Sequence, residues 1–266
     1  MKKYKGVVFF DVDGTLIDYS KGIKSPTEKT KESIKKLQEV GYLTMLATGR
    51  PMSFVTEELL NLGLSGYIAS NGSYAEIEGE IIFDYPIENS KLKDLLGFLN
   101  ENKIEYILEG QAESYVADIN GKEINKLIEE ADLNKEAFTD IWDVETVRTN
   151  KVVVICEDMN ICKMIKEKYG HEYVFIYYAD GKAFEMFIGK YTKGYGVEQL
   201  INKLGIDQKD TYAFGDGEND IEMFQVVKHG IAMGGYHEGL KEHAYDFTEN
   251  VENEGIYKGL KKLGLI

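Results

Sequence analysis

The sequence has few of the residues that build disulfide scaffolds or histidine metal centres. Of 266 residues, 2 are cysteines (Cys156 and Cys162) and 4 are histidines. The cysteines lack the CxxC spacing of zinc and redox motifs and are too few for a disulfide scaffold. The segment that begins His237-Glu238 has lysine at position 241, where a zincin helix needs its second histidine. We therefore expect reduced cysteines and no histidine metal site.

Long apolar runs and an excess of positive charge are also missing. No stretch approaches the roughly 20 apolar residues of a membrane helix. The apolar run at residues 7–10 ends at Asp11, without the cleavage site of a signal peptide. We expect a cytoplasmic protein with no membrane partner. Asp and Glu number 46 against 31 Lys and Arg, a net charge of -15. This charge disfavours a nucleic-acid partner, because phosphates would be repelled, but one local cation could still admit a small anionic substrate. Nothing in the sequence predicts the oligomeric state.

The first third of the chain does contain a regular alternation of strand and helix patterns. Strands are predicted at residues 6–10, 42–49 and 66–70, and helices at residues 25–41 and 51–63. The first helix has an expected N-cap at Ser25, followed by Pro26 and by Glu28 in a capping box. Strands joined by helices imply a parallel sheet with right-handed crossovers.

The pattern changes at about residue 85. Helix and strand patterns are mixed from there to residue 188, and the regular alternation resumes after Gly189. We predict an α/β protein with two parts: an open, Rossmann-like parallel-sheet core at residues 1–84 and 189–266, and an inserted α+β unit at residues 85–188. No GxGxxG segment follows a strand and opens a helix, so the core is not expected to bind a dinucleotide.

The stretch VVFFDVDGTL brings two like charges to the end of a strand that is predicted to be buried. Ligands of open parallel sheets bind beyond the carboxyl ends of the strands. Asp11 follows the first strand directly, and Asp13 comes two residues later. Gly14 relaxes the backbone, so both carboxylates can turn into one cleft, where they repel each other unless a proton or a cation intervenes. On these residues alone, a solvated turn capped by aspartates is an equally good interpretation.

Two later segments place anion-binding groups near the same edge of the sheet. The stretch LATGR gives Thr48 and Gly49, a hydroxyl and backbone N–H groups at the start of the predicted second helix. The stretch YTKG places Lys193 at the start of another helix. Asn71 ends the third strand, and it either faces this cleft or is only a turn residue.

A further segment, FGDGEND, adds acidic and amide side chains after another strand. It contains Asp216, Asn219 and Asp220. Together with the first aspartates, these residues form an oxygen-rich set of the kind that suits Mg²⁺. Glu218 in the same segment adds another acid, for which we have no role.

With these segments in this order, the sequence resembles the haloacid dehalogenase-like phosphatases, and within them the Cof-type subgroup, over its full length. The family pattern DxDGT is matched at residues 11–15 and the pattern GDxxND at residues 215–220. The threonine and lysine of the other two family motifs are matched by Thr48 and Lys193. In this subgroup an α/β cap is inserted between the third core strand and the lysine motif, which corresponds to the insert predicted at residues 85–188.

The resemblance implies a role for each matched residue. Asp11 is the implied nucleophile and Asp13 the implied general acid and base. The implied Mg²⁺ ligands are the Asp11 carboxylate, the backbone carbonyl of Asp13 and Asp216, and Asp220 is implied to support this metal site without ligating the ion. The implied phosphate contacts are Thr48, Gly49, Lys193 and Asn219.

Electrostatics agrees with this chemistry. A phosphate monoester carries close to two negative charges at neutral pH, and two unit charges about 4 Å apart repel by about 4 kcal/mol at an effective dielectric of about 20. Attack by Asp11 therefore needs compensation, which Mg²⁺ and Lys193 would supply. We expect Mg²⁺-dependent hydrolysis of a small phosphorylated metabolite, such as a sugar phosphate, through an aspartyl-phosphate.

Two alternatives remain open on the sequence. A sugar phosphomutase would need a sugar bisphosphate activator and would release little inorganic phosphate. A non-catalytic sensor of phosphometabolites would need neither Asp11 nor Asp13.

Overall fold

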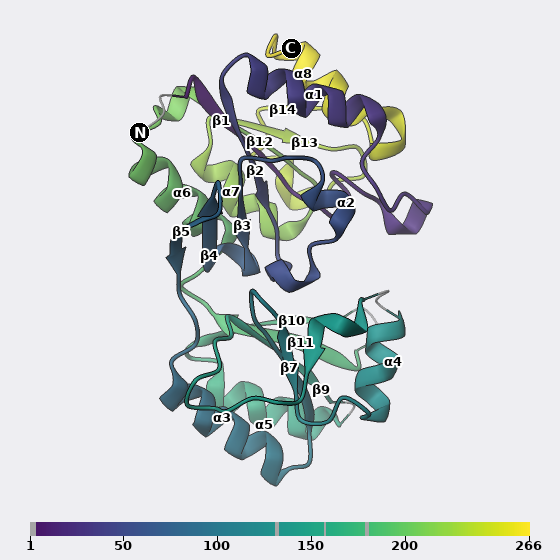
Figure 1. The fold of residues 1–266 in the computed structure, drawn as a ribbon, viewed down its shortest axis with the longest axis vertical. Coiled ribbons are helices and arrows are strands. Elements are labelled where there is room, and N and C mark those ends of the chain that lie inside the picture. The colour runs from purple at the N-terminus through teal and green to yellow at the C-terminus, as the bar shows by residue number, and fades with distance from the viewer. Residues whose placement is uncertain (1–3, 131–132, 157, 179–180) are drawn as a thin grey trace. The chain divides into compact units, whose positions relative to one another are not determined.

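A computed structural model describes residues 4–130, 133–156, 158–178 and 181–266 of the chain (Figure 1). The chain divides into two compact units. The core unit comprises Met1–Gly49, Val55–Asp84 and Thr192–Ile266, and the inserted unit comprises Arg50–Phe54 and Tyr85–Tyr191. Each unit has its own sheet and its own apolar core, so each is described by itself.

The core unit is built on an eight-stranded sheet with the order β14-β13-β12-β1-β2-β3-β4-β5. Neighbouring strands are parallel from β14 to β3, whereas β3, β4 and β5 pair antiparallel. All residues of the central strand β1 are buried, as expected for a strand that is covered on both faces. The strands are β1 (Gly6–Phe10), β2 (Tyr42–Ala47), β3 (Gly66–Ala69), β4 (Tyr74–Ile77), β5 (Glu80–Asp84), β12 (Thr211–Gly215), β13 (His229–Ala232) and β14 (Asp246–Phe247).

Helices cover both faces of this sheet. Val7 and Phe9 of β1 pack with apolar residues of α6 and α7. On the other face, Gly259 of α8 packs against the ring of Phe214, which stacks on Phe10, and α1 lies beside α8 (Figure 1). The helices are α1 (Glu28–Glu39), α2 (Glu57–Leu60), α6 (Lys193–Leu204), α7 (Ile221–Val226) and α8 (Gly255–Lys262). The predicted α/β fold with a parallel-sheet core is confirmed.

The first helix begins later than its sequence pattern predicts. α1 starts at Glu28, and its N-cap is Thr27, whose hydroxyl oxygen accepts a hydrogen bond from the Thr30 N–H at 3.2 Å. The predicted N-cap at Ser25 is therefore wrong. The Thr27 hydroxyl also donates to Glu254 Oε2 at 2.5 Å, so the N-cap residue contacts a segment that lies far away in the sequence.

The second predicted helix, at residues 51–63, is mostly absent. A short 3₁₀ turn at Met52–Phe54 and the four-residue α2 replace it. The turn is bonded to the rest of the inserted unit: the Met52 N–H donates to Gln111 Oε1 at 3.0 Å, and the Ser53 hydroxyl donates to the Gly110 carbonyl at 2.9 Å. Residues 50–54 therefore belong to the inserted unit. The α-helix predicted to start just after Gly49 is replaced there by this 3₁₀ turn.

The inserted unit has a six-stranded sheet with the order β10-β11-β9-β6-β7-β8. Its neighbouring strands are antiparallel except for the parallel pair β7 and β8. α3 and α5 pack on one face, where Leu95 and Ile165 contact a core that includes Val152 and Val154. The elements are α3 (Asn89–Glu101), β6 (Glu105–Glu109), β7 (Ser114–Val116), α4 (Lys122–Glu130), β8 (Phe138–Thr139), β9 (Lys151–Ile155), α5 (Met159–Tyr169), β10 (Tyr173–Tyr177) and β11 (Ala183–Ile188). This arrangement confirms an α+β insert.

The opposite face of the inserted sheet carries a buried charge cluster. Lys151 Nζ on β9 lies 2.9 Å from Glu109 Oε2 on β6 and 3.0 Å from Glu185 Oε1 on β11. The Glu109 side chain is 4% exposed and that of Glu185 is 18% exposed. One ammonium can balance only one carboxylate, so burial, helped by repulsion from Glu185 and opposed by Lys151, raises the pKa of Glu109 to about 7.

None of the helices in the described part of the chain combines the length and the apolar character needed to cross a membrane. α3, the longest of them, has 13 residues.

Candidate active site

The pairing of β1 with β12 places Asp11 and Asp216 at the same edge of the core sheet. The strands are parallel, with Phe10 opposite Phe214, and the Asp11 N–H donates to the Phe214 carbonyl at 3.0 Å. Asp11 and Asp216 each come within a residue of the end of their strand. Because parallel strands end at a common edge, side chains that are distant in the sequence meet there.

Lys193 joins this edge from the first turn of α6. The helix begins at Lys193, and the Thr192 side chain caps it by accepting a hydrogen bond from the Tyr195 N–H at 3.2 Å. Lys193 Nζ donates to Asp11 Oδ1 at 2.7 Å and to Asp220 Oδ1 at 2.5 Å. The Lys193 side chain is fully buried, so its charge is balanced by these carboxylates and not by water.

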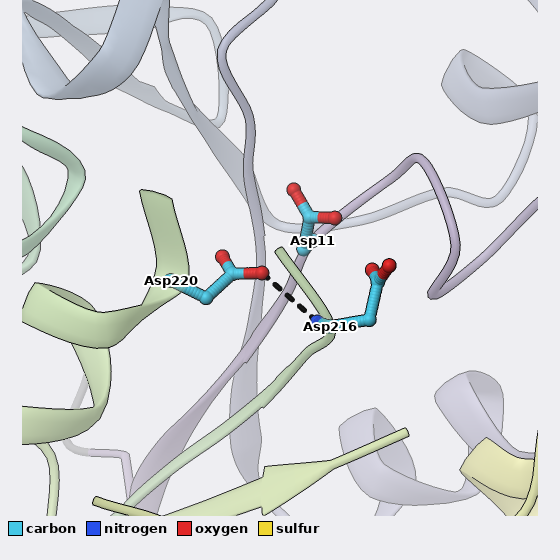
Figure 2. A group of neighbouring side chains, drawn as sticks. All are labelled: Asp11, Asp216 and Asp220. Atoms are coloured by element: carbon cyan, nitrogen blue, oxygen red, sulfur yellow. Dashed lines mark hydrogen bonds between the residues drawn. The ribbon is translucent and has the colours of Figure 1, made fainter. Parts of the chain in front are cut away.

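Asp220 holds the loop that follows β12. Its Oδ2 accepts hydrogen bonds from the backbone N–H groups of Asp216 and Gly217, both at 3.0 Å, and its Oδ1 receives Lys193. Figure 2 shows the Asp220 carboxylate turned toward the backbone of Asp216, with Asp11 close by. The Asp220 carboxylate therefore already accepts three hydrogen bonds, as expected for a residue that holds neighbouring groups in position.

Asp216 is oriented by two residues of the first loop. The Thr15 hydroxyl donates to Asp216 Oδ1 at 3.0 Å. Gly14 has a φ of +86°, and a side chain there would collide with the Asp216 carboxylate. Glycine at position 14 is therefore required both by its backbone conformation and by the close approach of this carboxylate. Sequence reasoning missed the contact of Thr15, although this threonine belongs to the DVDGT stretch.

Asp13 differs from its neighbour Asp11. Asp11 is buried, whereas Asp13 is exposed. Among the described residues, Asp11, Asp216 and Asp220 form a group of acids. One carboxylate oxygen of each lies within 4.8 Å of the corresponding oxygens of the other two. The glycine at position 14 lets both carboxylates turn into one cleft, and in the structure this group contains Asp11 but not Asp13. Asp13 remains near enough to Asp216 to add repulsion.

Burial perturbs the acids of this group. Desolvation, reinforced by repulsion from Asp220 and opposed by Lys193, raises the pKa of Asp11 well above its usual range. Desolvation and the same neighbour raise the pKa of Asp216 to about 6. Three carboxylates face one ammonium, so the group is short of positive charge. The chemistry of the donors fits a hard divalent cation that prefers oxygen ligands, and the group could hold such a metal ion.

Thr48, Gly49 and Asn219 gather beside these acids around Asn71. The Asn71 N–H donates to the Thr48 carbonyl at 3.2 Å, and Asn219 Nδ2 donates to Asn71 Oδ1 over 3.5 Å. A Cβ on Gly49 would lie 2.9 Å from Asn71 Oδ1 and 3.6 Å from Asn219 Nδ2. Sequence reasoning left open whether Asn71 faces the site; the structure places its carboxamide there.

A family described as haloacid dehalogenase-like hydrolase matches residues 8–260. The chain belongs to this family, and the resemblance stated from the sequence is confirmed. So is the expected enzyme class, that of the phosphoric monoester hydrolases.

Individual relatives match along nearly the whole chain. A protein of Bacillus subtilis (strain 168) named "Putative phosphatase YkrA" is 29% identical over 266 residues, which cover 98% of each chain. Phosphoglycolate phosphatase of Archaeoglobus fulgidus is 26% identical over 257 residues, or 96% of each chain. The crystal structure of a hypothetical protein from Geobacillus kaustophilus HTA426 has a TM-score of 0.89 at 30% identity, covering 98% of this chain and 99% of that one.

Proposed function

We propose that this protein is a Mg²⁺-dependent phosphatase that hydrolyses a small phosphorylated metabolite, such as a sugar phosphate, through an aspartyl-phosphate on Asp11. The observation that carries the proposal is the buried Asp11 carboxylate, held by the Lys193 ammonium at 2.7 Å and adjacent to Asp216. The archaeal relative named phosphoglycolate phosphatase supports a small phosphorylated substrate.

Mg²⁺ would be held by Asp11, Asp216 and the backbone carbonyl of Asp13, because Asp220 is already committed to Lys193 and to two backbone N–H groups. When bound, the ion supplies positive charge that offsets the repulsion between the phosphate and Asp11.

The side chains of the protein have separate proposed roles in binding the phosphate and in transferring protons. Thr48, Gly49, Lys193 and Asn219 bind and orient the phosphoryl oxygens. An Asp11 oxygen attacks phosphorus while the ester P–O bond breaks, and Asp13 gives its proton to the leaving alkoxide oxygen. Asp13 then takes a proton from water as this water attacks phosphorus, so inorganic phosphate leaves and the Asp11 carboxylate is regenerated.

The nucleophile is tested with Asp11→Asn, which keeps the shape of the side chain and removes the attacking charge. We expect phosphate release from a panel of metabolites to fall by at least about a thousandfold, with the circular dichroism spectrum unchanged. Wild-type protein quenched in acid after mixing with a labelled phosphate ester should retain label that hydroxylamine removes, and the Asp11→Asn protein should not.

Two results would contradict the proposal. Near-normal phosphate release by a verified Asp11→Asn sample would exclude the covalent route. Transfer of phosphate between sugar positions, dependent on a bisphosphate and with little phosphate released, would identify a phosphomutase.

A further inference from the structure

Three consecutive residues after β3 have a left-handed backbone. The φ angles of Ser70, Asn71 and Gly72 are +48°, +52° and +90°. Only the third is glycine, and both Ser70 and Asn71 are almost completely buried, at 1% and 4% exposure. Side-chain-bearing residues adopt this conformation at a cost, and such strain concentrates at functional sites.

This strained turn contacts all three segments that supply the proposed phosphate contacts. The Asn71 N–H donates to the Thr48 carbonyl, and the Asn71 carboxamide meets Asn219. A side chain at Gly72 would collide with the carbonyl oxygen of Thr192, which precedes Lys193. The turn therefore fixes the spacing between the Thr48 loop, the start of α6 and the loop after β12.

The identity of the central residue is not explained by the turn alone. Glycine adopts a left-handed conformation without strain, and nothing about the backbone requires a carboxamide at position 71. What asparagine adds is an acceptor oxygen that lies 3.5 Å from Asn219 Nδ2 and beside the place where a Gly49 side chain would be.

We propose that Asn71 is a positioning residue of the phosphate site: its Oδ1 accepts one N–H of the Asn219 amide and so selects the amide orientation in which the other N–H is directed at the phosphoryl group. The inference rests on the proposed function, in which Asn219 and Gly49 contact the phosphate. An amide rotated by half a turn would present its oxygen, which repels phosphate, in place of a donor. Asn71 therefore determines whether Asn219 presents an N–H donor or its oxygen to the phosphate.

The test uses Asn71→Gly, because this change separates stability from activity. Glycine relieves the left-handed strain but removes the acceptor. We expect the thermal unfolding midpoint to stay equal or rise, while kcat/KM falls at least tenfold and inorganic phosphate, used as a product inhibitor, binds at least tenfold more weakly. Glu78→Gly is the matched control, since Glu78 also has a positive φ (+50°) but is exposed at the β4–β5 turn; its kcat/KM should change less than twofold.

A second variant, Asn71→Asp, keeps an acceptor oxygen and adds charge. It should keep kcat within a few-fold of wild type while raising KM, because Asn219 remains oriented but the phosphate is repelled. Asn71→Gly with full activity, or with a midpoint several degrees below wild type, would overturn the inference, since the side chain would then serve no site or serve only stability. Absence of phosphate release by the wild type on every ester tested would instead overturn the proposed function itself.

Discussion

At the scale of single residues, the site is a set of buried charges that depend on one another. The Lys193 side chain is fully buried and contacts both Asp11 and Asp220. Removing one partner of a buried pair leaves the other charge without compensation, which costs about 3–5 kcal/mol. The loss of Lys193 is therefore expected to lower the stability of the core unit as well as the activity.

Lys193→Met should expose this dependence. Burial already raises the pKa of Asp11, and Lys193 opposes that rise. Without the ammonium the folded-state pKa of Asp11 rises further. A raised carboxyl pKa contributes stability that is present below the unfolded value and lost as the pH rises through the folded value. At pH 8 we expect the free energy of unfolding of Lys193→Met to be lower than that of the wild type by about 3 kcal/mol or more. This difference should become smaller toward pH 5. Urea denaturation measures both values.

The control for this change is Lys203→Met on the same helix. Lys203 is exposed and donates to the Ile82 carbonyl at 2.9 Å, so the change should cost less than about 1 kcal/mol. An equally large deficit of Lys193→Met at both pH values would show that lost packing, and not charge, is responsible.

Metal dependence also belongs to the residue scale. We expect EDTA to abolish phosphate release and Mg²⁺ to restore it, because Asp11 and Asp216 form an oxygen-only donor set. Ca²⁺ should inhibit, because its longer bonds and higher coordination number misplace the attacking oxygen. In Asp216→Asn, Mg²⁺ should restore little or nothing at the concentration that saturates the wild type. Full activity in a chelated, metal-free preparation would refute this prediction.

At the scale of elements, the ends of strands were predictable and the loops were not. The buried run before Asp11 and the helix start at Lys193 are visible in the sequence, and parallel pairing brings such ends together. The direction of the Asn71 carboxamide and the contact from Thr15 to Asp216 depend on loop backbone angles that distant segments impose. The predicted second helix failed for the same reason, since contacts with the inserted unit override local helix propensity.

The charge cluster across β6, β9 and β11 predicts a pH-dependent stability of the inserted unit. The pKa of Glu109 is raised to about 7 in the folded protein, above its ordinary value of about 4.3 in an unfolded chain. Its contribution to stability is therefore complete below the unfolded value and is lost as the pH rises through about 7. Unfolding of the inserted unit should occur at lower temperature at pH 8 than at pH 5.

Glu109→Gln should make the unfolding temperature of the inserted unit less dependent on pH, because an amide cannot lose a proton. The slope of this unfolding temperature against pH should therefore be smaller than in the wild type. Glu113→Gln serves as the control, as Glu113 is an exposed acid in the same unit, and it should leave the slope as in wild type. A slope that persists in Glu109→Gln would assign the pH dependence to other groups.

At the scale of the whole molecule, two units with separate cores predict two unfolding events. The single tryptophan, Trp142, lies in the inserted unit, where its indole N–H donates to the Val116 carbonyl at 2.7 Å. Its fluorescence therefore reports the inserted unit, whereas far-ultraviolet circular dichroism reports both. We expect saturating Mg²⁺ and inorganic phosphate to raise the midpoint seen by circular dichroism and leave that of Trp142 unchanged, because a ligand stabilises only the unit that binds it.

The Asp216→Asn protein is the control for that experiment, and neither of its midpoints should respond to the two ligands. A single transition, seen at one temperature by both probes and shifted as a whole by Mg²⁺ and phosphate, would show that the two units unfold together.

The discontinuity of the core unit has a consequence for the growing polypeptide on the ribosome. β1 pairs with β2 on one side and with β12 on the other, and β12 is translated only after the whole inserted unit. Until then one edge of β1 has no partner strand, and such edges recruit other chains. The inserted unit, which is nearly contiguous in sequence, can fold during that interval. Asp11 and Thr48 therefore emerge long before Lys193 and Asp216. A nascent or prematurely terminated chain has only part of the proposed catalytic site.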